Sequence, residues 1–115
     1  MLTYQHFRAG GFTTWEQMLA QVAEFASSLG PDGIVAISQS EDKGDAVVTV
    51  WHLDPSDGSS AAMGFRIFRG GGFTPWEQLF TDAATFASEV GVENIAAISQ
   101  SEDKSDGVVV VWYWE

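Results

Sequence analysis

The chain has no cysteine and few basic residues. Without cysteine it can form no disulfide and perform no thiol chemistry, so the folded state must depend on the burial of side chains. Only five Lys and Arg accompany sixteen Asp and Glu, which gives a formal net charge of −11 at pH 7. Such an acidic chain repels a phosphate backbone, and we therefore expect no nucleic-acid partner.

Long hydrophobic runs and catalytic motifs are also missing. No stretch approaches the roughly 18 apolar residues of a membrane span, and residues 1–20 lack the basic start and apolar run of a signal peptide. These features predict a cytoplasmic protein without a membrane partner. The only histidines, His6 and His52, stand without a recognisable catalytic motif. We therefore predict no catalytic residue and favour a non-enzymatic role.

Apolar and aromatic side chains are abundant, and they are arranged in a repeat. The hydrophobic fraction of 45%, with five Trp and eight Phe, indicates a packed globule. Residues 7–54 align with residues 68–115 without a gap, and 28 of the 48 aligned pairs are identical. We predict one domain over residues 1–115, with pseudo-two-fold symmetry between two units. The first unit is residues 1–54, the linker is 55–62 and the second unit is 63–115.

Each unit is predicted to begin with a strand and a helix. Residues 3–8 and 63–69 are rich in aromatic and β-branched side chains, which favours strands. Apolar residues three or four apart then predict amphipathic helices over 15–29 and 76–90. The expected helix signals are the capping pairs Thr13 with Glu16 and Thr74 with Glu77, Pro75 at the first helical position, and the terminal glycines Gly30 and Gly91.

Two further strands complete each unit, joined by a polar five-residue link. They are predicted at 34–40 and 46–53, and again at 95–101 and 107–114. The later strand of each pair is apolar on both faces, so we place it in the centre, antiparallel to both neighbours. The predicted fold class is α+β: tandem β-α-β-β units that form one roughly six-stranded, mainly antiparallel sheet with two helices on one face.

A sheet with both helices on one face leaves its other face uncovered. The residues expected there are Trp51, Leu53, Val110, Trp112 and Trp114. Such an apolar face predicts packing against a second chain, closure into a barrel-like core, or binding of a flat apolar ligand. Of these we favour a homodimer, since symmetric pairing is the commonest way to cover such a patch.

The glycine turns before the helices are an alternative site. A cation, a glycine turn and a hydroxyl at a helix N-terminus suit a small anion. The residues concerned are Arg8, Gly10, Gly11, Thr13, Arg69, Gly71, Gly72 and Thr74. The competing interpretation is structural: the glycines make the turn, threonine caps the helix, and glutamate already occupies its positive end.

The acidic links between the paired strands carry several oxygen ligands. Their members are Ser40, Glu41, Asp42, Asp45, Ser101, Glu102, Asp103 and Asp106. Hard cations bind such groups, but the spacing is not that of a calcium loop and a lysine lies in the middle. We interpret both links as solvated hairpin tips, and expect no metal and no cofactor.

Overall fold

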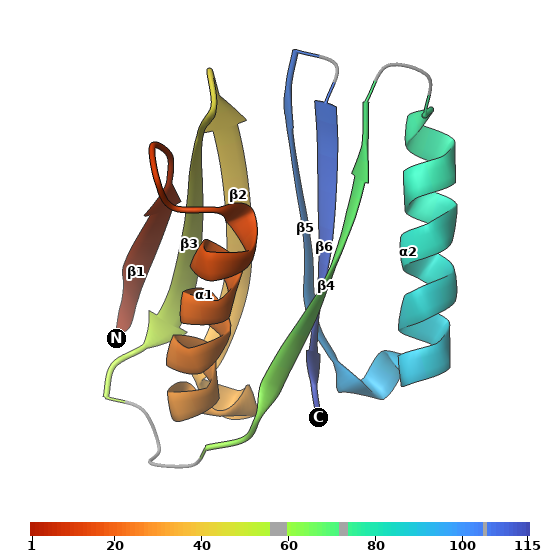
Figure 1. The fold of residues 1–115 in the computed structure, drawn as a ribbon. Helices are drawn as coiled ribbons and strands as arrows, with labels where there is room; N and C mark the ends of the chain where they lie inside the picture. Colours follow the sequence, from red (N-terminus) through yellow and green to blue (C-terminus); the bar gives the residue numbers. More distant parts are fainter. Residues whose placement is uncertain (56–59, 72–73, 105) are drawn as a thin grey trace.

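The structure is a computed structural model that describes residues 1–55, 60–71, 74–104 and 106–115 (Figure 1). Its elements are β1 (Leu2–Ala9), α1 (Trp15–Leu29), the 3-10 turn η1 (Pro31–Gly33), β2 (Ile34–Asp42), β3 (Asp45–Leu53), β4 (Met63–Gly70), α2 (Trp76–Val90), the 3-10 turn η2 (Val92–Asn94), β5 (Ile95–Asp103) and β6 (Asp106–Trp114). The predicted α+β class and the repeated β-α-β-β order are confirmed. The middle of the predicted linker, residues 56–59, lies outside the described residues.

The two helices form where the apolar spacing predicts them, and each is fifteen residues long. Met18, Leu19 and Val22 of α1 are fully buried. The helices end at Gly30 and Gly91, whose φ angles of 76° and 105° are readily adopted only by glycine. In the part of the chain that the structure describes, neither helix is long and apolar enough to cross a membrane.

The N-terminal cap of α1 lies one residue later than predicted. Thr14 is the cap: its hydroxyl accepts the amide of Gln17 at 3.1 Å, and the Gln17 side chain accepts the amide of Thr14 at 2.9 Å. The predicted pair of Thr13 with Glu16 is therefore wrong. The amide of Thr13 is held instead by the carbonyl of Gly10 at 3.1 Å, so the chain is still in its turn at that residue.

The second helix begins in the same way but without a capping side chain. Pro75 is its N-cap residue and makes no side-chain cap bond, so the prediction of Pro75 inside the first turn is wrong by one position. The amide of Thr74 donates to the carbonyl of Gly71 at 3.2 Å, as Thr13 does in the first unit. The predicted cap of Thr74 with Glu77 is accordingly not formed.

The strand after each hairpin lies in the centre of its sheet, as predicted. β3 pairs with β1 and β2, and β6 pairs with β4 and β5, antiparallel in every case. The links are shorter than the five residues expected, because β2 continues to Asp42 and β3 starts at Asp45. Lys43 and Gly44 have φ angles of 53° and 79°, as a two-residue hairpin turn requires.

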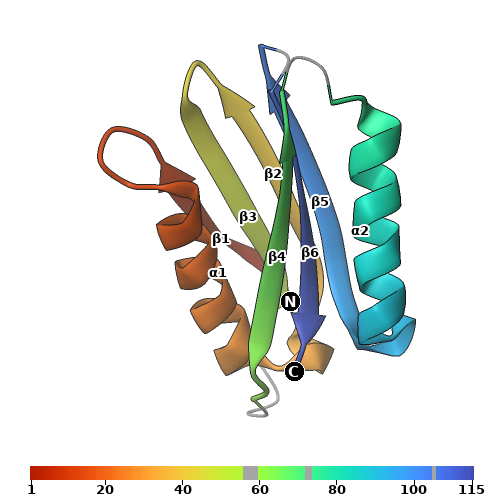
Figure 2. The ribbon, with the colours of Figure 1, turned by 45° about the vertical axis from the view of Figure 1, so that its right-hand side comes forward.

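The six strands form two sheets of three, where the sequence analysis expected a single sheet. β2 and β5 run side by side in the same direction, but they meet through side chains and are not paired. Helix α1 packs on β1 and β3 of its own sheet and also on β4 of the other (Figures 1 and 2). Helix α2 packs on β4 and β6, on the far side of the second sheet. The helices therefore do not share one sheet face.

The two units repeat the same element order and strand register. They are not packed about the pseudo-two-fold axis that was expected. The side-chain amide nitrogen of Gln39 in the first unit donates a hydrogen bond to the hydroxyl of Ser101 in the second, at 3.0 Å. A two-fold axis would repeat this contact between Gln100 and Ser40, but both of these residues are exposed. The units are instead packed head to tail: the helix side of the first covers the helix-free side of the second.

This arrangement buries both faces of β6 and only one face of β3. The larger core cluster joins α1 to Val48 and Val50 of β3 and to Val110 and Trp112 of β6. A smaller cluster joins α2 to the opposite face of β6. The second face of the central strand is therefore covered within the chain in the second unit, whereas for the first unit its covering by a partner stays a prediction.

Candidate binding surface

The helix-free side of the first sheet is a largely apolar and aromatic surface that the described part of the chain leaves uncovered. We call it the open face, and it includes Leu2, Tyr4, His6, Ser38, Ser40, Thr49, Trp51 and Leu53. Strand register brings them together, since Leu2 lies opposite Leu53, and Tyr4 opposite Trp51. The exposed fractions are 57% for Tyr4 and 38% for Trp51, which is high for large aromatic residues on a sheet.

An aromatic pair with a polar anchor lies at the centre of the open face. The ring centroids of Tyr4 and Trp51 are 5.7 Å apart with the planes inclined at 49°. The indole nitrogen of Trp51 donates to the hydroxyl of Ser38 at 3.3 Å. The two rings are thus held in a fixed orientation on an exposed surface by each other and by a hydrogen bond.

The second sheet carries the same construction on its equivalent side, which we call the covered face. It includes Met63, Phe65, Ile67, Ser99, Ser101, Val110, Trp112 and Trp114. The rings of Phe65 and Trp112 lie 5.8 Å apart at 48°, and the indole nitrogen of Trp112 donates to Ser99 at 3.0 Å. Trp112 has no exposed surface, because the first unit lies over it.

A chain of side-chain hydrogen bonds ties the covered face to the first unit. Ser99, which holds the indole of Trp112, donates to the carbonyl oxygen of Gln39. The amide nitrogen of Gln39 donates to Ser101 at 3.0 Å, and Ser101 donates to Glu41 at 3.0 Å. Burial raises the pKa of the Glu41 carboxyl, and the bond from Ser101 opposes this change.

The five residues expected on one aromatic surface are divided by this packing. Trp51 and Leu53 lie on the open face, with 38% and 42% of their surface exposed. Val110 and Trp112 are fully buried inside the chain, so they are not available to a second molecule. Trp114 is partly buried beside them. Sequence reasoning missed Leu2 and Tyr4, because a central β3 places β1 beside it but does not fix the register that sets them opposite Leu53 and Trp51.

The glycine turns are engaged within their own units. Arg8 forms an ion pair with Asp45, and Arg69 pairs with Asp106 at 2.9 Å. In the first unit the carbonyl of Gly10 accepts a hydrogen bond from the amide of Thr13, and Gly11 has the positive φ that the turn needs. In the second unit the carbonyl of Gly71 accepts the amide of Thr74 in the same way, and Gly72 lies outside the described residues. These contacts give the arginines a structural role, and anion binding at the turns stays a prediction.

The acidic hairpin tips come close together without forming a metal centre. The carboxylate of Asp103 accepts the amide of Gly44 at 3.0 Å, which ties one tip to the other. Within the described ranges, no group of three or more His, Asp or Glu side chains is placed to hold a metal ion. His52 packs edge-on against Phe25, with ring centroids 5.2 Å apart, as a core-flanking aromatic residue. No catalytic arrangement is built from these groups.

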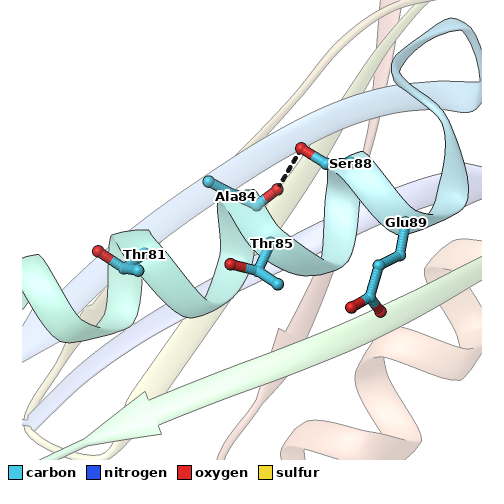
Figure 3. Close-up of a pocket in the computed structure, with 5 residues that line it drawn as sticks. All are labelled: Thr81, Ala84, Thr85, Ser88 and Glu89. Carbon is cyan, nitrogen blue, oxygen red and sulfur yellow. Dashed lines mark hydrogen bonds between the residues drawn. The ribbon is translucent and has the colours of Figure 1, made fainter.

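A shallow groove on the outer surface of α2 is a concave feature among the described residues. Its lining residues are Thr81, Ala84, Thr85, Ser88 and Glu89 (Figure 3). The hydroxyl of Ser88 donates to the carbonyl of Ala84 at 2.8 Å. The groove is lined by small side chains and hydroxyls, which suits the close approach of another polypeptide better than a chemical reaction.

Comparisons with known proteins give no guide to function. No protein-family model matches the chain, and no curated protein and no solved structure resembles it significantly. Any functional conclusion must therefore come from the surfaces described above.

Proposed function

We propose that the protein is a non-enzymatic assembly module that binds a second copy of itself through the open face. The observation that carries this proposal is the match between the Tyr4–Trp51 pair, which is exposed, and the Phe65–Trp112 pair, which is covered by protein. The Phe65–Trp112 pair of the second unit thus already packs against protein, namely the first unit of the same chain. Its exposed copy offers the aromatic centre typical of interface hot spots.

Self-association can be measured by sedimentation or light scattering over a wide range of protein concentration. We expect the wild type to shift from monomer to larger species, and Trp51→Ala to weaken this shift by at least about tenfold. Phe12→Ala is the matched control, because Phe12 is a fully exposed aromatic residue in the turn before α1 and not on the open face. A wild-type chain that stays monomeric at the highest concentration would contradict the proposal.

Salt gives a second readout. Each copy carries a net charge of −11, so the copies repel one another at low ionic strength. Salt at about 0.15 M reduces the screening length to about 8 Å and should strengthen the association. An interface made of cross-chain ion pairs would respond in the opposite direction.

A second candidate function is the binding of a flat apolar small molecule on the Tyr4–Trp51 pair. The exposure of both rings supports it. Such a ligand would change the tryptophan fluorescence of the wild type and leave that of Trp51→Ala unaffected. A monomeric wild type that shows this saturable change would favour ligand binding over assembly.

A further inference from the structure

The end of the molecule opposite the open face also exposes apolar residues that are buried in the first unit. Phe80 and Ile98 are 43% and 53% exposed, whereas the aligned residues Leu19 and Ile37 are 0% and 5% exposed. Ala84 is exposed as well, and its counterpart Ala23 is buried. In the first unit these positions belong to the core cluster that includes the covered face. In the second unit the described part of the chain leaves them exposed.

The polar residues beside them are also repeated. We call this surface the α2 side, and its members are Phe80, Ala84, Ser88, Ile98, Gln100 and Glu102. Gln100 and Glu102 align with Gln39 and Glu41, which bond Ser99 and Ser101 of the covered face. The serines of the open face, Ser38 and Ser40, are the counterparts of Ser99 and Ser101. Each end of the molecule thus carries one half of the hydrogen-bond chain found between its units.

Ser88 supplies a third point of correspondence. Its counterpart Ser27 donates to the carbonyl of Ala23 and at the same time accepts the amide of Met63, at 2.9 Å, where β4 enters the contact. Ser88 makes the same bond to the carbonyl of Ala84 (Figure 3), so its hydroxyl has the same orientation along the helix. The residue that aligns with Met63 is Leu2, at the start of β1 on the open face.

We infer that a second copy of the chain docks its α2 side on the open face, in the head-to-tail arrangement that the two units of one chain already adopt. This inference rests on the proposed function and names the partner surface. The contact joins two different surfaces, so a pair of copies leaves one open face and one α2 side unoccupied, and further copies can add. The units of successive chains would then follow one another as they do within a chain.

The differences between the two contacts fit an association that is reversible. On the open face Tyr4, His6 and Thr49 replace the more apolar Phe65, Ile67 and Val110 of the covered face. A surface that is exposed in the free chain must be compatible with water, and these replacements make it so while Trp51 and Ser38 keep the recognition geometry.

A mixing experiment separates head-to-tail docking from the pairing of two open faces. Trp51→Glu disables the open face and leaves the α2 side intact, and Ile98→Glu does the reverse. Each variant alone should associate at least about tenfold more weakly than the wild type. An equimolar mixture should recover a one-to-one dimer that stops at two chains, because one functional surface remains on each partner.

Two further variants guard against misfolding and charge effects. Tyr4→Glu is a second open-face variant at a position with 57% exposure, and circular dichroism melting confirms that each variant is folded. Val92→Glu is the charge-matched control: Val92 is 73% exposed, and its counterpart Pro31 is exposed in the first unit. It should associate like the wild type.

The outcomes distinguish the two proposals. If Ile98→Glu associates like the wild type while Trp51→Glu and Tyr4→Glu do not, and mixing rescues nothing, the docking surface is not the α2 side and the head-to-tail inference is wrong, although assembly through the open face stands. If the wild type does not associate, or the open-face variants associate normally, the proposed function fails as well.

Cross-linking gives a direct readout, because the chain has no cysteine of its own. Ser40→Cys and Gln100→Cys place single thiols on the two surfaces that should meet. With a short thiol-specific cross-linker, a dimer should form when the two variants are mixed, and not when Ser40→Cys is alone. The double variant Gln39→Cys with Ser101→Cys is the positive control, since it tests the same contact inside one chain. Cross-linking of Ser40→Cys to itself, without cross-linking to Gln100→Cys, would overturn the inference.

Discussion

The two units are built from closely similar sequences but have different surroundings. They share element order, strand register and even the inclination of the aromatic pair, 49° in one and 48° in the other. Yet Trp51 is 38% exposed and its counterpart Trp112 is fully buried. The local sequence thus determines the strand order, register and aromatic pair of each sheet. The position of a unit in the molecule determines which of its sheet faces is buried from solvent.

The largest predicted difference between the units concerns this tryptophan pair. Trp112→Ala should reduce the free energy of unfolding by about 3–5 kcal/mol, because it removes a fully buried indole and the partner of Ser99. Trp51→Ala should cost about 1 kcal/mol, since its side chain is already in contact with water. Urea unfolding followed by circular dichroism, at a dilution where the chain is monomeric, measures both.

Equal losses for the two variants would contradict the different burial of the two faces. A Trp112→Ala chain that is unfolded without urea would still agree with it, because a loss of this size is a large part of the stability of a small domain. Trp112→Phe then provides a milder comparison, since it retains a ring and loses the hydrogen bond to Ser99.

The repeat, the element order and the central strand could be predicted because each depends on local patterns. Apolar spacing identified both helices, and the two-sided apolar character of 108–112 placed β6 in the centre. The caps were predicted one residue early, because the capping pattern of Thr13 with Glu16 competes with that of Thr14 with Gln17, and the turn bond to Gly10 decides between them.

The packing of the units could not be predicted from two similar repeats, because nearly the same residues lie on every face. Gln39 and Gln100 are identical in sequence context, and only one of them meets a partner. The sequence does carry one signal that distinguishes the two faces: the first unit has Tyr4, His6 and Thr49 where the second has more apolar residues. The more polar helix-free face is the one that the structure leaves in water.

The next prediction tests the hydrogen-bond chain between the units. Gln39→Ala removes a donor to Ser101 and an acceptor of Ser99 from a site where both serines are buried, so it should cost about 1–3 kcal/mol of unfolding free energy. Gln100→Ala removes the same side chain from an exposed site and should change stability by no more than about 0.5 kcal/mol in the monomer. Urea unfolding of the pair measures the difference, and equal effects would contradict a one-sided contact.

The smallest predicted effect depends on pH and concerns Glu41. Burial is the largest cause and raises the pKa of this carboxyl, and the nearby carboxylates of Asp106 and Asp103 raise it as well. The hydrogen bond from Ser101 and the positive charge of Arg69 lower the pKa, but by less. A raised pKa means that the folded state holds this proton more readily than the unfolded state, so the stabilising contribution is present in acid and is lost as the pH rises through the folded pKa.

Glu41→Gln should therefore raise the melting temperature at pH 7 by about one or two degrees, because the amide can still accept the bond from Ser101 without bringing a charge into the contact. The gain should disappear in acid below the ordinary carboxyl pKa, where Glu41 is protonated. Glu102→Gln is the matched control: it removes the same charge from the aligned, exposed position, and so corrects for the reduced net charge. Equal gains from the two variants at every pH would assign the effect to net charge, and not to the burial of Glu41 between the units.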